Sequence, residues 1–305
     1  MYNIFVGILH AVGDSKHPLY YLIAATFVNI VLDLLFVAVL HMGVGSAALA
    51  TTISQGISAV LCCIRLMKVE KDYRLVLGDI GFHLESLRNI IRFGLPSGVQ
   101  NSVIALANVV VQTNINSFGK AAMAGCGSYS KLEGFAFLPV TCFTQALSTF
   151  VGQNLGAKQH DRVKKGVGFG IICSCVMAEI VGIISYVFAP QLIGFFAKTQ
   201  AAVDFGAKHM QTISLFYCLL AFSHCIAGIM RGAGKATVPM FTMLTCWCVI
   251  RVTYITLALK VAYDLTTISW AYPLTWGCSS VIFLFYFLEA DWIHNFDRQA
   301  AKLTL

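Results

Sequence analysis

Residues 18–41 read PLYYLIAATFVNIVLDLLFVAVLH, an almost unbroken apolar run in which Asp33 is the one acidic side chain. A helix needs about 20 apolar residues to cross the roughly 30 Å hydrocarbon layer of a bilayer. Inside lipid, each backbone polar group has to be satisfied within its own helix or a closed barrel. The run therefore predicts a membrane-spanning helix.

The same pattern recurs along the whole chain, which is 58% hydrophobic and only 11% charged, against about 25% charged residues in soluble domains. A chain so poor in charge cannot cover a water-facing surface. We predict an all-α polytopic membrane protein. Its expected spans are 18–41, 45–66, 93–118, 132–153, 167–190, 208–230, 238–261 and 266–289, with a shorter apolar run at 2–12.

The basic residues alternate between the gaps that separate these spans. One set comprises the gaps 13–17, 67–92, 154–166 and 231–237 and the tail after 290. Fifteen Lys and Arg lie in this set or at the adjoining helix ends, against five in the other set. By the positive-inside rule the first set is cytoplasmic, and so is the C-terminus. The net charge of +7 then reflects topology, and we expect no nucleic-acid partner.

An internal repeat relates the two ends of the chain. Residues 8–20 read ILHAVGDSKHPLY and residues 229–241 read IMRGAGKATVPMF, so that Gly13 aligns with Gly234 and Pro18 with Pro239. The same offset aligns Ala50 with Ala271 and Ser58 with Ser279. Such parallel repeats relate the two halves of some transporters. Because the second copy needs six spans and the first shows about two and a half, we expect about three and a half further spans before Met1.

This repeat predicts four regions. Residues 1–66 form a partial N-terminal bundle, and residues 67–92 form a cytoplasmic linker. Residues 93–290 form a six-helix C-terminal bundle, and residues 291–305 a cytoplasmic tail. Within the linker, the apolar residues of 79–92 favour an amphipathic helix on the membrane surface; a plain charged loop is the alternative.

Three stretches resemble motifs of the multidrug and toxic compound extrusion (MATE) transporters. They are ILHAVGDSKHPLYYLIAATFVNIVLDLLFV at 8–37, FVGQNLGAKQHDRVKKG at 150–166 and RGAGKATVPM at 231–240. His10 departs from the Arg usual in the first turn. The resemblance implies two six-helix bundles, of which about eight and a half spans are present here. It also implies a monomeric antiporter of the plasma membrane, which exports amphipathic, often cationic organic compounds in exchange for Na⁺ or H⁺, with no cofactor.

A cation site is predicted in the first bundle. Asp33 lies deep in its span, where an ionisable side chain costs about 2.5–3.5 kcal/mol on insertion scales and indicates function. Asn29 lies on the same helix face, and Thr51 on the next span can add a hydroxyl. Oxygen ligands suit hard cations such as Na⁺, and the resemblance implies the same three residues. The alternative is that these side chains only hydrogen-bond neighbouring helices.

A polar stripe on the span 93–118 predicts a wet substrate cavity. Asn101, Asn108, Gln112 and Asn116 share one helix face; bonding to neighbouring helices is the alternative. Glu133, expected at the outer start of its span, can attract cationic substrates; an interfacial carboxylate with no role is the alternative.

Two further intramembrane charges, Glu179 and Arg251, are expected to pair, because a lone buried charge is costly. Asp264 is another candidate partner. His224 is expected to be a satisfied core histidine rather than a proton carrier.

Other functions find less support. Among the residues there is no clustered set of His, Cys and carboxylates at metal-ligand spacing, so neither an enzyme nor a bound metal other than Na⁺ at Asp33 is expected. A lipid or oligosaccharide flippase of the same superfamily needs a basic cavity, for which Arg251 is the only clear candidate. A non-transporting fragment is the remaining alternative.

Overall fold

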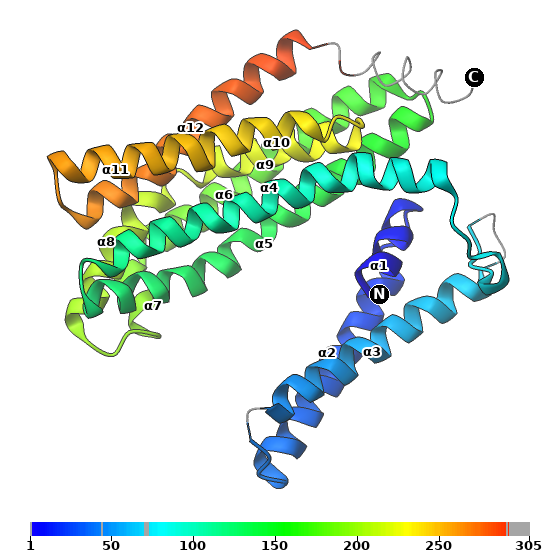
Figure 1. The fold of residues 1–305 in the computed structure, drawn as a ribbon, viewed down its shortest axis with the longest axis horizontal. Coiled ribbons are helices and arrows are strands. Elements are labelled where there is room, and N and C mark those ends of the chain that lie inside the picture. The colour runs from blue at the N-terminus through cyan, green and yellow to red at the C-terminus, as the bar shows by residue number, and fades with distance from the viewer. Residues whose placement is uncertain (1, 44, 70–72, 291, 293–305) are drawn as a thin grey trace. The chain divides into compact units, whose positions relative to one another are not determined.

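The computed structural model describes residues 2–43, 45–69, 73–290 and 292, and this part of the chain is helical with no strand (Figure 1). It divides into two compact units, Met1–His83 and Leu84–Leu305. Among the described residues, seven helices are long and apolar enough to cross a membrane, or eight if one bent pair counts as a single span. The predicted all-α polytopic fold is confirmed.

The described residues of the first unit form three α-helices. They are α1 (Tyr2–Ala11), α2 (Lys16–Asp33), which continues as a π-helical segment η1 (Leu34–Val39), and α3 (Gly45–Lys68). Both α1 and α2 pack on α3. The buried side chains of α3 recur every four residues and are mostly small, among them Ser46, Ala50, Ser54 and Ser58. Small residues on one face let helices approach closely in lipid, where no hydrophobic force drives association.

The second unit follows a short 3₁₀ turn, η2 (Leu77–Asp79). Its helices are α4 (Leu84–Asn116), α5 (Lys120–Gly156), α6 (His160–Val187), α7 (Ala189–Gly194), α8 (Gln200–Ser214), α9 (Tyr217–Gly232), α10 (Thr237–Met243), η3 (Leu244–Ile250, π-helical), α11 (Arg251–Val261) and α12 (Leu265–Glu289). The predicted span 208–230 is a broken one, because α8 and α9 meet at a bend of 56°.

Helices α5 and α9 cross with their backbones in contact. A Cβ atom on Gly228 would lie 2.5 Å from the Thr144 carbonyl oxygen, and one on Gly232 would lie 2.4 Å from that of Ser148. No larger residue fits these two positions unless the helices separate. Tight backbone crossings of this kind replace the missing hydrophobic force between helices in a bilayer.

The internal repeat is visible in the backbone. The turn after α1 has Gly13 at φ 83°, with Gly13 N bonded to His10 O and Asp14 N to Leu9 O. The turn after α9 has Gly234 at φ 76°, with the same two bonds between residues at the same offset. Both are glycine-terminated helix ends in which the left-handed residue satisfies the last carbonyls.

The linker differs from its prediction. No separate helix spans 79–92; residues 84–92 are instead the first turns of α4, which runs on through Gly94 and Pro96. Proline and glycine break helices in water, but membrane helices tolerate them because neighbouring groups satisfy the freed backbone. The predicted tail, 291–305, lies outside the described residues except for Trp292, whose ring stacks on Phe287.

The two ends of the second unit carry different numbers of basic residues. The α5–α6 turn, the start of α10 and the end of α12 lie at one end, and the α4–α5 and α11–α12 turns lie at the other (Figure 1). The first end, which also includes the start of α4, carries Arg88, Arg92, Lys158, Arg162, Lys164, Lys165, Arg231 and Lys235, whereas Lys120, Lys131, Lys198, Lys208 and Lys260 lie at or near the second. This matches the predicted alternation of the gaps. Which end faces the cytoplasm stays a prediction.

Candidate functional site

The first unit brings the three predicted cation ligands to adjoining positions on α2 and α3. Asn29 Nδ2 donates to Thr51 Oγ1 at 3.5 Å, so the two helices meet at these side chains. Asp33 follows one turn along α2, and its Oδ1 atom is buried with no hydrogen-bond partner among the described residues. A buried carboxylate oxygen without a donor is costly. A cation or a proton would satisfy it, so this donor set fits a hard cation.

The helix changes its hydrogen bonding directly after Asp33. Residues Leu34–Val39 are π-helical, and beyond them Leu40 N bonds to Leu35 O at 2.9 Å. A π-helical turn inside an α-helix is rare, and such turns occur frequently at functional sites. The change in winding sets the Asp33 side chain at a boundary between two helix types.

The second unit encloses the predicted cavity, with a volume of about 850 Å³. Its walls come from α4, α5, α8, α9, α11, α12 and η3. Of the polar stripe on α4, Asn101, Asn108 and Gln112 line the cavity. Asn116 is not among the lining residues and instead accepts a hydrogen bond from Gln112 Nε2 at 2.8 Å. Three of the four stripe residues therefore face the cavity, and the fourth supports a neighbour.

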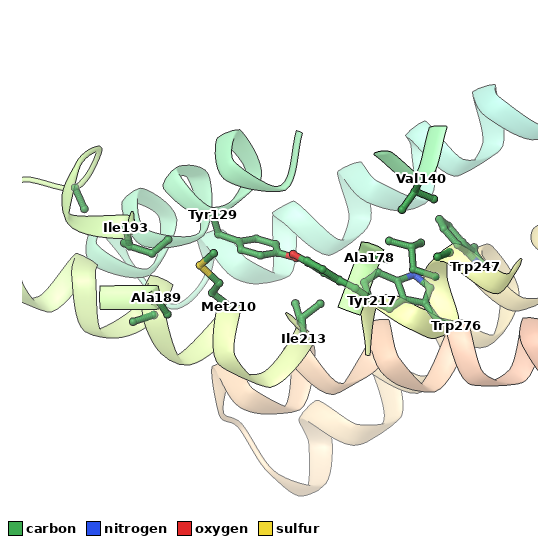
Figure 2. Packing of buried hydrophobic residues seen from close by; sticks show 14 of the residues in the cluster. Tyr129, Val140, Ala178, Ala189, Ile193, Met210, Ile213, Tyr217, Trp247 and Trp276 are labelled. Atoms are coloured by element: carbon green, nitrogen blue, oxygen red, sulfur yellow. The ribbon is translucent and has the colours of Figure 1, made fainter. Parts of the chain in front are cut away.

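Glu133 also lines the cavity, but it does not lie at the start of a helix. Because α5 begins at Lys120, the carboxylate is more than three turns into the helix. Tyr129 donates to Glu133 Oε1 at 3.1 Å, and the Tyr129 hydroxyl lies 3.4 Å from that of Tyr217. Figure 2 shows the two phenol groups meeting tip to tip in the core of this unit. The hydroxyl of Tyr129 thus fixes the carboxylate at the cavity wall.

The expected pair of Glu179 with Arg251 does not form. Glu179 Oε2 accepts from the backbone N–H of Cys218 at 3.2 Å. That N–H lies in the first turn of α9, where helix donors lack an intrahelical partner. The bend between α8 and α9 exposes this turn, and the Glu179 carboxylate caps it.

Arg251 is fully buried in the cavity wall and is held by neutral groups. Its Nη1 donates to Asn108 Oδ1 at 3.4 Å, and its Nη2 to Thr275 Oγ1 at 2.9 Å. The guanidinium lies 4.6 Å from the ring centroid of Tyr272 and 5.1 Å from that of Trp247. Both distances suit cation–π attraction, which strengthens away from water. Glu133 lines the same cavity and is a carboxylate that attracts Arg251 electrostatically.

His224 lies on the cavity wall instead of in a sealed core. Its ring meets Phe137 and Trp247 edge to face, and its Nε2 atom has no hydrogen-bond partner in the described part of the chain. The sequence reading missed Arg231, which lines the same cavity. A signal was available, because His224 and Arg231 are seven residues apart on α9 and thus share one face.

His209 is a further lining residue that the sequence did not indicate. It forms a 2.6 Å hydrogen bond with Ser269 and an edge-on contact with Tyr129. Its partners lie on helices distant in sequence, so no local pattern marks it.

A helical membrane bundle with an internal parallel repeat and a polar cavity is the architecture of a secondary transporter. The family model named MatE matches residues 96–257, just over half of the chain, and the chain belongs to that family.

Two curated relatives agree with this assignment. The probable multidrug resistance protein YpnP of Bacillus subtilis is 30% identical over 249 residues, which cover 81% of this chain and 55% of that protein. The probable multidrug resistance protein NorM of Thermotoga maritima is 27% identical over 249 residues, covering 80% and 53%. The chain thus spans about half the length of the curated relatives it matches.

A solved structure shows the same fold. An outward-facing multidrug resistance MATE family transporter of the MOP superfamily superposes with a TM-score of 0.86 at 20% identity. The match covers 97% of this chain and 66% of that one.

Proposed function

We propose that the protein is a secondary antiporter of the plasma membrane that exports amphipathic, often cationic organic compounds in exchange for Na⁺ or H⁺. The observation that carries the proposal is the buried Oδ1 of Asp33, which lies beside Asn29 and Thr51 and has no hydrogen-bond partner in the described part of the chain. A carboxylate held in this way within a membrane span is stabilised when a cation binds it.

Each group has a role in this proposal. Asp33 supplies the negative charge for the coupling ion, and Asn29 and Thr51 add neutral oxygen ligands. The cavity of the second unit holds the exported compound, with Glu133 opposite a cationic group and Trp247 and Tyr272 against its aromatic part. Coupling requires that the cation bind two states of the protein with different affinity. No covalent chemistry, cofactor or second subunit is needed.

The proposal is tested with the full-length protein in proteoliposomes loaded with a cationic fluorescent dye. An imposed Na⁺ or H⁺ gradient should drive dye movement against its concentration difference. Collapse of the gradient with an ionophore should stop it. Dye movement that is the same with and without either gradient would remove the antiport mechanism.

The orientation of the chain is a separate part of the proposal. The basic α5–α6 turn supports a cytoplasmic location for this turn and, with it, for the C-terminus. A cysteine placed at Lys158 in a cysteine-free background should react with an impermeant maleimide only after the cells are opened. Labelling of intact cells at this position contradicts the orientation.

A second candidate is the movement of a lipid-linked or other anionic head group. The cavity wall favours it more than the sequence did, because Arg231 lines the cavity together with Arg251. A fluorescent phospholipid with an anionic head group distinguishes the two candidates. Gradient-driven movement of this lipid, without movement of the cationic dye, would support the second.

A further inference from the structure

A groove of about 590 Å³ opens where α5 ends and α6 begins, apart from the substrate cavity. Phe150 of α5 lies on one side, and Arg162, Lys165 and Phe169 of α6 lie on the other. Gln159, which precedes α6, and Asp161, in the first turn of α6, complete its polar end. The groove is formed entirely by the second unit.

Within this groove, one face of α6 changes from basic to aromatic along the helix. Arg162, Lys165 and Phe169 are spaced by three and four residues, so they share a helix face. The first two lie in the first two turns of α6, and Phe169 is one turn further towards the apolar middle of the span. Its side chain is 72% exposed. The face therefore presents charge at one level and an aromatic ring at the next, as a phospholipid presents its head group and its acyl chains.

The apolar wall of the groove depends on Gly166. A Cβ atom at this position would lie 2.3 Å from the Phe150 ring, so the ring rests directly on the α6 backbone. This packing leaves open space beside Phe150 and Phe169. Glycine has no side chain, so Gly166 leaves more space here than any other residue would.

The charge of the groove favours an anion. Arg162 and Lys165 are exposed and form no ion pair with any described residue, and Lys158 and Lys164 lie in or next to the same turn. Of the described residues that line the groove, Asp161 is the one acidic residue. Basic pockets of membrane proteins at the cytoplasmic surface bind anionic lipid head groups, at about 1 kcal/mol for each Lys or Arg near the surface.

We propose that this groove binds one anionic phospholipid. The phosphate lies at Arg162 and Lys165, and an acyl chain lies along Phe150 and Phe169. A free phosphate would use the two basic side chains but gain nothing from the two rings. A zwitterionic lipid would use the rings but bring no net charge to the basic end. The site is independent of the transported compound and of the coupling ion.

The test counts lipids that stay bound to the purified full-length protein. The protein is reconstituted in nanodiscs that contain equal amounts of phosphatidylglycerol and phosphatidylcholine. Native mass spectrometry of the released protein then identifies the lipids that stay bound, by their mass. We expect one phosphatidylglycerol to be retained in preference. The double variant R162Q/K165Q should lose about 30-fold in this preference, which corresponds to about 1 kcal/mol for each basic side chain.

A matched control removes the same charge from the other end of the bundle. The variant K120Q/K260Q should retain the preference. An equal loss in both double variants would show that net charge alone attracts the lipid, and it would overturn the proposal. So would equal retention of the two lipids by the unmodified protein.

A second variant changes shape without changing charge. G166A forces the Phe150 ring into the groove, so retention of phosphatidylglycerol should fall although Arg162 and Lys165 remain. Soluble glycerol phosphate should not displace the bound lipid. If it displaces the lipid, or if G166A retains as much lipid as the unmodified protein, the groove does not hold an acyl chain and the proposal fails.

Discussion

The two copies of the repeat share a backbone but not a chemistry. Helix α1 ends at Ala11 and α9 at Gly232, and α2 starts at Lys16 where α10 starts at Thr237, in each case at the repeat offset. In each copy, one residue of this turn contacts the last helix of that copy. It is Asp14 in the first copy and Lys235 in the second. Asp14 Oδ2 lies 3.5 Å from Arg65 Nη2, whereas Lys235 Nζ lies 3.5 Å from the Tyr286 hydroxyl.

Inside the membrane the two copies diverge further. The counterparts of Asn29 and Asp33 are Ile250 and Tyr254, which offer no carboxylate. Conversely, Arg251 of the second copy corresponds to Ile30, an exposed apolar residue of the first. Helix ends and glycine turns are common to both copies because the fold requires them. The charged residues are not repeated, and we infer a division of roles between ion and substrate.

The largest expected effect is the loss of gradient-driven dye efflux when Asp33, which has no counterpart in the second copy, is changed. The variant D33N removes the charge but keeps the size, so gradient-driven dye efflux should fall to the rate seen without a gradient. Its matched control is Y254F at the repeat counterpart, which should leave efflux close to that of the unmodified protein. Proteoliposome efflux of both variants is the measurement. Undiminished efflux by D33N removes this carboxylate from the mechanism.

The next effect concerns the buried guanidinium. R251M should destabilise the protein by about 1–3 kcal/mol, because Asn108 and Thr275 lose a charged hydrogen-bond donor and two aromatic rings lose a cation. I30M at the counterpart, an apolar exchange at an exposed position, should change stability by less than about 0.5 kcal/mol. Unfolding by denaturant in mild detergent compares the two. Equal effects would mean that the Arg251 contacts do not stabilise the fold.

The two glycine turns test whether the backbone is constrained in the same way in both copies. Gly13 and Gly234 both have positive φ, where a residue with a Cβ atom is strained by about 1–2 kcal/mol. G13A and G234A should therefore destabilise the protein by similar amounts in the same denaturant assay. A large effect in one turn only would show that the common backbone is not under the same constraint in both copies.

The sequence predicts helices and glycine turns well, because the interactions that determine them involve residues close together in the sequence. Long apolar runs fix the helices, and the aligned Gly13 and Gly234 fix the two turns, because a left-handed residue is needed there whatever surrounds it. The stripe on α4 was predictable because a helix places residues seven and four apart on one face.

The failures have a common physical cause, which is contact between helices distant in sequence. The pairing of Glu179 with Arg251 was wrong because the bend at α9 leaves a backbone N–H that needs an acceptor. The burial of Arg251 between Trp247 and Tyr272 required knowledge of how α11, η3 and α12 pack. The boundary predicted between the linker and the next span was wrong, because α4 starts at Leu84 and runs on through Gly94 and Pro96. The placement of the linker at the membrane surface stays a prediction.

The smallest expected effect is the pH dependence of the first turn. Burial alone raises the pKa of the Asp14 carboxyl, but hydrogen bonds from His17 and the charges of His17 and Arg65 outweigh it, so the pKa lies below its usual value. A depressed folded-state pKa adds stability that is present above the unfolded value of about 3.9. That stability is lost as pH falls through the folded-state pKa.

D14N should therefore lower the free energy of unfolding at pH 6 by about 0.5–1 kcal/mol, which is measured as a lower midpoint of thermal unfolding. The difference from the unmodified protein should shrink below about pH 4, as the Asp14 carboxyl becomes protonated. The control is K235M in the second copy, whose effect should show no such dependence in this acid range. A D14N effect that is constant from pH 6 to pH 3 would show that the carboxylate charge contributes nothing.

Direct cation binding to the full-length protein tests the central claim, that Asp33 in the first copy holds the coupling ion. Radioactive Na⁺ binding and proton release on addition of Na⁺ or of the cationic dye are measured for the unmodified protein, D33N and Y254F. The account predicts saturable binding of one cation, or release of one proton, in the unmodified protein and Y254F, and neither in D33N. Cation binding by D33N equal to that of the unmodified protein would contradict it.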